Sequence, residues 1–494
     1  MKSNILTYRK FQSLHRNGFS TIPVYKKVLG DMLTPISAWV SLCDKSNYAF
    51  LFESVEKGSR FSRYSYIGIN PKKIIKSINS KTFISKNGDF FEIEKPFLKV
   101  LNDLQKNFAS ANLINLPPFT GGLVGYLGYE TIAWYEDIPI HESDEDSIPD
   151  AFFMLYNELI AFDHYEGTVV IISNSNLGDG KNSLDHYNNC LSTIDKIGEL
   201  LHSRVNHETL IQRSHYELKS NFSKNDFKNA VKKAKEHIVN GDIFQLVLSQ
   251  KFQKKTTADP TTIYRALRKV NPSPYLFHIK ICDFDIIGSS PELLVKVEDE
   301  KIEIRPIAGT RARGNSAKED KFLANDLLSD KKELAEHLML IDLARNDVGK
   351  VSQYGSVKLT EKMVVEYFSH VMHIVSNVEG KLKNDKNGFD ALKSGFPAGT
   401  VTGAPKLRAM ELIHDLEIER RGVYSGAIGF FDFKGNINSC IAIRTMVIKD
   451  DIVQFQSGAG IVYDSIPEDE YKETIDKAKA LVKAIELAEN GLVI

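Results

Sequence analysis

Short runs of apolar residues separated by turns fill the first third of the chain. Segments such as YAFLFE, FFMLYNELIAFD and GTVVIIS are rich in the β-branched and aromatic residues of strands. Between about residues 173 and 222 the sequence becomes polar around one helical stretch. We therefore predict an N-terminal region at 1–172, a linker at 173–222 and a C-terminal domain at 223–494.

Three later segments have the periodicity and end signals of helices. The first spans 223–240 and opens with a capping pair of Ser and Asp. The second spans 330–346 and is apolar nearly all round in its second half, so we expect it to be buried. The third spans 465–490, with Ser465 as the predicted N-cap and Glu468 completing a capping box.

Residues 301–307 alternate polar and apolar positions in the manner of a half-buried strand. The run ends in Ala308, Gly309 and Thr310, and arginines follow. Small residues followed by positive charge are an unusual end for a strand, so we treat this stretch as a candidate part of a functional site.

Composition narrows the class of protein. The 494 residues contain 63 Lys and Arg against 64 Asp and Glu, a formal charge of -1, so no basic excess indicates nucleic acid. The four cysteines form no C-x-x-C pair, which disfavours a disulfide framework and a thiolate metal site. No apolar run approaches the roughly 20 residues of a membrane span. We expect a soluble cytoplasmic protein that binds neither nucleic acid nor membrane.

Two pairs of glutamates are spaced for one helix face each. Glu333 and Glu336 are three residues apart, as are Glu470 and Glu473, and Lys477 lies four beyond the last of them. If the two faces meet, they form an oxygen-ligand site for a hard divalent ion such as Mg2+. A solvated charged surface is the alternative.

A histidine pair lies in the strand-like segment HVMHIVSNVEG, at His370 and His373. General acid–base chemistry is one interpretation, and a neutral, hydrogen-bonded core histidine is the other. A zinc pair is disfavoured because the sequence indicates no third nitrogen or sulfur ligand nearby.

Glycine-rich stretches suggest anion binding without a nucleotide. FPAGTVTGAPK lacks the spacing of a phosphate loop, and GGLVGYLGYE lacks that of a dinucleotide fingerprint. Their small residues, like those of SGAGIV, let backbone amides approach a carboxylate. Tyr424 and Arg444 fall in strand-like runs, where arginine can clamp a carboxylate. Together these residues indicate a site for a small di-anionic substrate.

The ordered motifs of the second half resemble those of the chorismate-utilising enzymes. They are SSPELLVK, RPIAGTRARG, ELAEHLMLIDLARND, HVMHIVSNVEG, FPAGTVTGAPK, YSGAIG, IAIRTM and SGAGIVYDSIPEDEYKET. Within that group the chain resembles component I, the large subunit, of anthranilate synthase, densely over 225–485 and more loosely before. The resemblance implies an α+β fold in which two large, mainly antiparallel sheets pack face to face with helices outside. It also implies a regulatory N-terminal region and a chorismate-binding catalytic domain.

The same resemblance implies a role for each matching residue. Glu336 and Glu473 would bind Mg2+, with Glu333 and Glu470 behind them. The substrate would be held by Thr310, Thr400, Tyr424, Arg444, Lys477 and the backbone of Gly458, Ala459 and Gly460. Glu292 would protonate the departing ring hydroxyl as ammonia adds, and His373 would act in the elimination of pyruvate that follows.

Two positions distinguish members of the family. Enzymes that add water usually have a lysine base where this chain has Gln245, and aminodeoxychorismate synthases have a nucleophilic lysine where it has Ala308. Both residues favour direct attack by ammonia and anthranilate as the product. Aminodeoxychorismate, isochorismate or salicylate synthesis is the alternative, and so is an inactive regulatory subunit.

No cysteine has the context of a glutamine-hydrolysing centre. The resemblance therefore implies a separate glutamine amidotransferase subunit, component II. It also implies that the two subunits form a hetero-oligomer that acts in tryptophan biosynthesis. It also implies feedback inhibition by tryptophan, at a site formed by Glu53, Ser54, Asn271, Pro272, Ser273, Pro274 and Tyr275.

Overall fold

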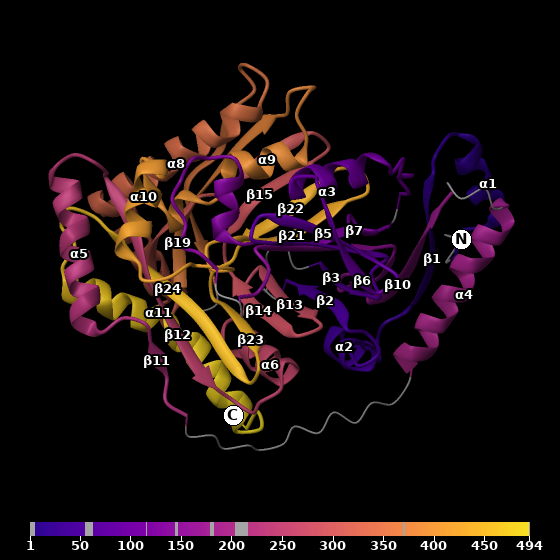
Figure 1. The fold of residues 1–494 in the computed structure, drawn as a ribbon, viewed down its shortest axis with the longest axis horizontal. Helices are drawn as coiled ribbons and strands as arrows, with labels where there is room; N and C mark the ends of the chain where they lie inside the picture. The colour runs from indigo at the N-terminus through magenta and orange to yellow at the C-terminus, as the bar shows by residue number, and fades with distance from the viewer. Residues whose placement is uncertain are drawn as a thin grey trace.

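The computed structural model describes residues 5–54, 63–114, 116–143, 147–177, 182–202, 216–368 and 371–493. Two sheets of 12 strands each dominate these residues (Figure 1). Every pairing between the named strands of this described part is antiparallel.

The first sheet has the order β1 (Thr21–Leu29), β10 (Thr168–Asn176), β9 (Glu158–Asp163), β3 (Tyr64–Ile69), β2 (Tyr48–Glu53), β13 (Tyr275–Ile281), β14 (Phe284–Ser290), β23 (Thr445–Lys449), β24 (Ile452–Ile461), β12 (Gln245–Lys255) and β11 (Lys219–Ser220), with β20 (Gly403–Ala404) also paired to β12. The second has the order β17 (Ile307–Ala312), β19 (Val371–Lys381), β16 (Lys301–Ile304), β15 (Leu293–Glu298), β22 (Ile437–Ile441), β21 (Ala427–Asp432), β7 (Gly122–Leu127), β8 (Ala151–Tyr156), β4 (Lys73–Ile78), β5 (Lys81–Lys86) and β6 (Asp89–Ile93), with β18 (Lys358–Tyr367) on β19.

Both sheets combine strands from the two sides of the predicted linker. In the first sheet β2 pairs with β13, and in the second β7 pairs with β21. The segment at 173–222 therefore separates two parts of the sequence, but strands from both parts pair with each other in each sheet. Whether 1–172 and 223–494 behave as separate domains stays a prediction.

A core shared by the two sheets shows that they pack face to face. Phe50 and Phe277 of the first sheet belong to the same buried cluster as Tyr126 and Phe152 of the second. Burial of such apolar faces is the main driving force for this packing. The predicted α+β class, with two large antiparallel sheets, is thus confirmed.

Helices cover the outer faces of the sheets (Figure 1). They are α1 (Tyr8–Arg16), α2 (Pro35–Cys43), α3 (Phe97–Lys106), α4 (Ser183–His202), α5 (Lys224–Val239), α6 (Pro260–Val270), α7 (Ala317–Ser329), α8 (Lys331–Val351), α9 (Gly388–Gly395), α10 (Lys406–Leu416) and α11 (Pro467–Glu489). Within the described residues no helix has both the length and the hydrophobicity needed to span a membrane.

The predicted helix ends are confirmed for one helix and corrected for the other two. Ser223 caps α5 as predicted. α8 starts where expected but continues to Val351. Leu338 is 49% exposed, so the prediction that this helix is buried nearly all round was wrong. In α11 the N-cap is Ile466, because the hydroxyl of Ser465 accepts a hydrogen bond from the N–H of Val462 instead.

The predicted strand at 301–307 is two strands. β16 ends at Ile304 and β17 starts at Ile307, since Pro306 has no N–H to give to a ladder. β17 then continues through the small residues, with a bulge between Ala308 and Thr310 where Gly309 has a φ of 66°. A glycine at this φ is typical of a bulge that re-aims neighbouring side chains.

Candidate active site

A cavity of about 570 Å³ lies where the two sheets meet α8 and α11. Strands β12 and β24 of the first sheet and β17 and β19 of the second contribute to its wall. It gathers nearly all the candidates from sequence: Gln245, Glu292, Ala308, Thr310, Glu333, Glu336, His373, Thr400, Tyr424, Arg444, Gly458, Gly460, Glu470, Glu473 and Lys477.

Glu292 follows the end of β14 and is 7% exposed. Burial raises the pKa of this carboxyl to about 8, although the nearby positive charges of Lys477 and Arg444 act in the opposite direction. A carboxyl with this pKa keeps its proton at neutral pH. Glu292 can therefore donate a proton, as a general acid does.

Arg444 and Tyr424 occupy turns, which corrects the prediction of strand-like runs. Arg444 lies between β22 and β23 with a φ of 50°, and Tyr424 lies in the turn before β21. Arg444 forms no ion pair with any described residue, which leaves its guanidinium available to a carboxylate. Burial raises the pKa of Tyr424 to about 12, so its phenol stays a neutral hydrogen-bond donor.

Gln245 lies between helix α8 and strand β24, which contains Gly458 and Gly460. Its amide Nε2 donates to Oε1 of Glu336 at 3.0 Å, and its Oε1 is buried without a partner among the described residues. A Cβ on Gly460 would lie 2.8 Å from that Nε2, so glycine makes room for the amide. The free carbonyl oxygen can accept a hydrogen bond from a small N–H donor.

His373 has its ring fixed by β17. Nδ1 lies 2.9 Å from the carbonyl oxygen of Gly309 and 3.1 Å from the hydroxyl of Thr310. A carbonyl only accepts, so Nδ1 carries the hydrogen and Nε2 keeps its lone pair. Burial lowers the pKa of His373, so the ring is a neutral base at pH 7. His370 lies outside the described residues.

The four glutamates face the same cavity from two helices. Glu333 and Glu336 come from α8, and Glu470 and Glu473 from α11. Burial, with the neighbouring Glu336 second, raises the pKa of Glu333, as expected where carboxylates crowd together. In the described part of the chain no three His, Cys, Asp or Glu side chains are placed so that together they could hold a metal ion. The donor set still fits Mg2+, which needs only one or two carboxylates and keeps several waters.

Lys477 connects helix α11 to strand β24 through its side chain. Its ammonium donates to the carbonyl oxygen of Gly458 at 2.9 Å and pairs with Glu473 at 2.7 Å. Ala459 is the one substrate candidate outside the cavity lining, because alternation along β24 turns its methyl group into another buried cluster. Lys332 and Gln456 line the cavity and were missed, since neither stands out in its sequence context.

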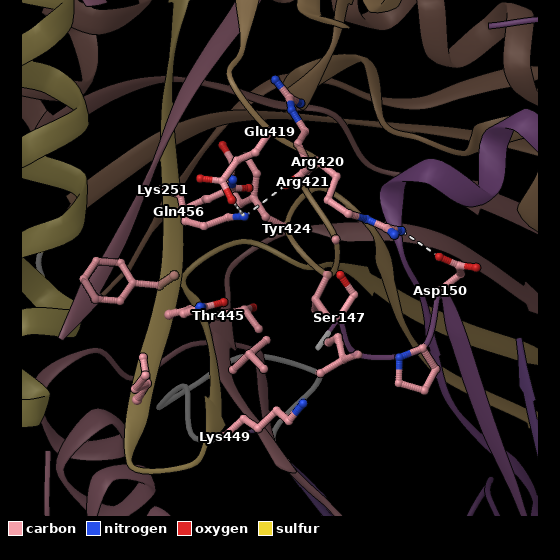
Figure 2. Close-up of a pocket in the computed structure, with 18 of the residues that line it drawn as sticks. Ser147, Asp150, Lys251, Glu419, Arg420, Arg421, Tyr424, Thr445, Lys449 and Gln456 are labelled. Carbon is pink, nitrogen blue, oxygen red and sulfur yellow. Dashed lines mark hydrogen bonds and ion pairs between the residues drawn. The ribbon is translucent and has the colours of Figure 1, made fainter. Parts of the chain in front are cut away.

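A second cavity of about 400 Å³ adjoins the first, and Tyr424 and Gln456 line both. Arg420 pairs with Asp150 in its wall at 2.6 Å, as Figure 2 shows. Its lining lacks Glu292, the histidine and the four glutamates. The candidate chemistry is therefore confined to the larger cavity.

A smaller cavity, of about 110 Å³, lies at the predicted tryptophan site. Glu53, Ser54, Pro274 and Tyr275 line it, whereas 271–273 do not. Glu53 is 5% exposed, and its Oε2 accepts a hydrogen bond from the phenol of a buried tyrosine at 2.6 Å. Its Oε1 has no partner among the described residues, which suits it to an ammonium group.

Comparison with known proteins identifies the family of the chain. A family model described as chorismate binding enzyme matches residues 47–483. The chain belongs to the chorismate-binding enzymes. Anthranilate synthase component 1 of Acetivibrio thermocellus is 46% identical over 481 residues, which cover 95% of this chain and 96% of that one. The protein of the same name from Aquifex aeolicus is 42% identical over 493 residues, covering 98% and 99%.

Two solved structures share the fold. The crystal structure of anthranilate synthase component I from Streptococcus pneumoniae is 38% identical, with a TM-score of 0.76, and the match covers 92% of this chain and 98% of that one. The isochorismate synthase MenF of Escherichia coli is 16% identical with a TM-score of 0.70 over 96% and 98%. At that identity the likeness concerns the fold alone.

Proposed function

We propose that this chain is the large subunit of an anthranilate synthase, which converts chorismate and ammonia to anthranilate, pyruvate and water. One observation carries the proposal: a buried carboxyl that is protonated at neutral pH, Glu292, shares a cavity with the neutral amide of Gln245 and the methyl group of Ala308. The site thus has an acid for the leaving group, a glutamine instead of a lysine base at 245 and no lysine nucleophile at 308.

In the first step ammonia forms a C–N bond to the ring and the ring C–O bond breaks, with a shift of the double bonds. Glu292 gives its proton to the departing hydroxyl, which leaves as water. The free Oε1 of Gln245 orients ammonia, while Arg444 and Lys477 hold the substrate's two carboxylates.

In the second step the C–O bond between the ring and the side chain breaks and the ring becomes aromatic. The side chain leaves as enolpyruvate, which takes up a proton to become pyruvate. This elimination removes a proton from the ring. His373 is the base we assign to it, since its Nε2 has a lone pair and its Nδ1 is fixed by Gly309.

Glu336 and Glu473 would hold Mg2+, with Glu333 and Glu470 behind them. When bound, the ion supplies positive charge to the ring carboxylate of the substrate. The support is the arrangement of the four glutamates around one cavity, together with the raised pKa of Glu333, which is due first to burial and second to the neighbouring Glu336.

The ammonia would come from a glutamine amidotransferase subunit, component II. Burial raises the pKa of all four cysteines, Cys43, Cys190, Cys282 and Cys440, so none has the character of a catalytic thiolate. Feedback inhibition by tryptophan is proposed for the small cavity at Glu53. A cytoplasmic location stays a prediction.

The test is a fluorescence assay for anthranilate with purified protein, chorismate, Mg2+ and ammonium. Anthranilate should form without any partner subunit. A product that forms without ammonium would point to isochorismate or salicylate synthesis, and no product from folded, Mg2+-supplemented protein would refute the proposal.

A further inference from the structure

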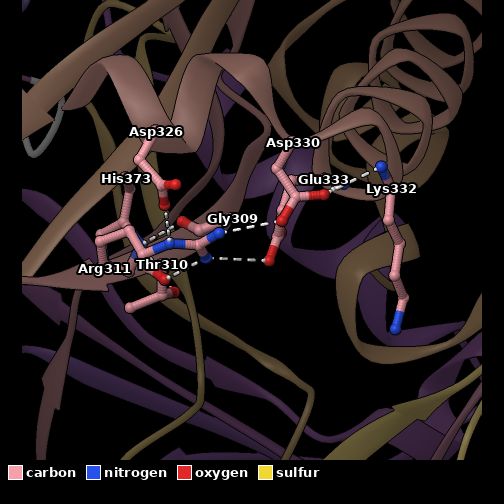
Figure 3. Close-up of polar contacts among 8 residues, drawn as sticks. All are labelled: Gly309, Thr310, Arg311, Asp326, Asp330, Lys332, Glu333 and His373. Carbon is pink, nitrogen blue, oxygen red and sulfur yellow. Dashed lines mark hydrogen bonds and ion pairs between the residues drawn. The ribbon is translucent and has the colours of Figure 1, made fainter. Parts of the chain in front are cut away.

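Arg311, three residues after the bulge-flanking Ala308, contacts three carboxylates at the edge of the candidate active site. Its guanidinium donates to Asp326 of α7 at 3.0 Å, to Asp330 at 2.9 Å and to Glu333 of α8 at 3.4 Å, as Figure 3 shows. One planar side chain thus connects strand β17 with two helices.

Asp330 shares its two oxygens between the helix and the arginine. Its Oδ1 caps α8 by accepting from the N–H groups of Lys332 and Glu333, at 3.0 and 3.3 Å. Its Oδ2 accepts from Arg311. The arginine therefore grips the end of the helix that carries Glu333 and Glu336.

The bulge in β17 makes this contact possible. A Cβ on Gly309 would lie 3.1 Å from Oε2 of Glu333, which shows how closely the strand passes α8. After the bulge Thr310 contacts His373, and the next residue, Arg311, contacts α8. The histidine and the glutamates are thus positioned by adjacent residues of one strand.

We propose that Arg311 is a positioning residue that fixes the first turn of α8, and with it Glu333 and Glu336, for binding a divalent cation. The inference rests on the proposed function. The side chains of its three ion pairs are 24% to 54% exposed, so solvent screens their attraction and geometry is the main contribution. The rigid fork of arginine can hold several carboxylates at once, whereas lysine holds one point.

The charge of Arg311 opposes this effect, because a positive group near the glutamates repels a cation. Arg311→Lys separates the two contributions, since it keeps the charge and removes the fork. Arg313→Lys is the matched control. Arg313 is the first residue after β17. It binds Asp320 of α7 at 2.6 Å and the carbonyl oxygen of Phe368 at 2.7 Å, and among the described residues it has no hydrogen bond or ion pair to α8.

The experiment titrates Mn2+ into each resting protein and follows the free ion by electron paramagnetic resonance. Arg311→Lys should weaken Mn2+ binding about tenfold or more, the usual effect of losing a partner of a metal ligand. Arg313→Lys should bind as wild type does. The Mg2+ concentration for half-maximal anthranilate formation should shift by the same factor, with kcat at saturating Mg2+ nearly unchanged.

Unchanged Mn2+ binding in Arg311→Lys, or an equal loss in both variants, would overturn the inference. A wild-type protein that makes anthranilate but binds no Mn2+ would overturn it as well and leave the reaction standing. If wild type makes no anthranilate while the Arg311→Lys effect on Mn2+ is seen, the proposed reaction fails and the positioning role holds.

Discussion

Substitution of Glu292 by glutamine tests both the chemistry and the electrostatics of the site. With a pKa of about 8, the carboxyl is roughly nine-tenths protonated at pH 7. A carboxyl with the ordinary value would be protonated in only about three molecules per thousand. Burial thus increases the supply of acid about 300-fold.

Glu292→Gln should lower kcat for anthranilate by about 100- to 10,000-fold, the usual contribution of a general acid. In wild type the rate should fall as pH rises through about 8, because the acid form is lost there. Raising the pH also increases un-ionised ammonia, so rates are to be compared at one fixed concentration of ammonia. An active variant with an unchanged pH profile would refute the acid role of Glu292.

The same pKa predicts a stability effect that needs no substrate. A carboxyl whose pKa is raised by folding destabilises the fold as pH increases: the cost is absent below about pH 4.5 and complete above about 8. At pH 7 it is on the order of 3 kcal/mol. Glu292→Gln should therefore raise Tm at pH 8 and lose this advantage near pH 5. A Tm difference independent of pH would show that the pKa is not raised.

Three further substitutions test the site and its regulation. Ala308→Lys should reduce anthranilate formation roughly tenfold or more, because the added side chain enters the cavity, while circular dichroism and Tm stay near wild type; unaffected output would mean that position 308 does not face the substrate. Gly460→Ala should displace the amide of Gln245 and raise KM for ammonia about tenfold, by a larger factor than KM for chorismate. Gly349→Ala, where a Cβ would meet nothing within 4 Å, is its control, and equal effects would exclude the specific clash. Glu53→Gln should weaken inhibition by tryptophan about tenfold or more at unchanged uninhibited activity; retained inhibition would place the amino group elsewhere.

Much of the site could be predicted because many of its residues can be recognised from their type and spacing in the sequence. Glu333 and Glu336 are spaced for one helix face, and the structure puts that face on the cavity. The alternation of strand residues also indicates that the side chain of Ala459 points to the opposite face of β24 from Gly458 and Gly460.

Other features depend on backbone geometry that composition does not reveal. Arg444 has apolar neighbours on both sides, which favours a strand, yet its φ of 50° ends the run and turns the guanidinium into the cavity. Lys332 and Gln456 are ordinary residues in their own segments. They reach the cavity only because the two sheets and α8 meet there, and those contacts are long-range.

The mixed origin of the sheets has a consequence for how the protein is made. Strand β2, with the apolar sequence YAFLFE, has β3 on one side and β13 on the other, and β13 begins about 220 residues later. At typical rates of synthesis the ribosome needs roughly 10 to 40 s to cover that distance. During this interval β2 has an unpaired, hydrophobic edge of the kind that joins other chains. The strand beside the small cavity at Glu53 is thus also a segment of the nascent chain that needs protection from aggregation.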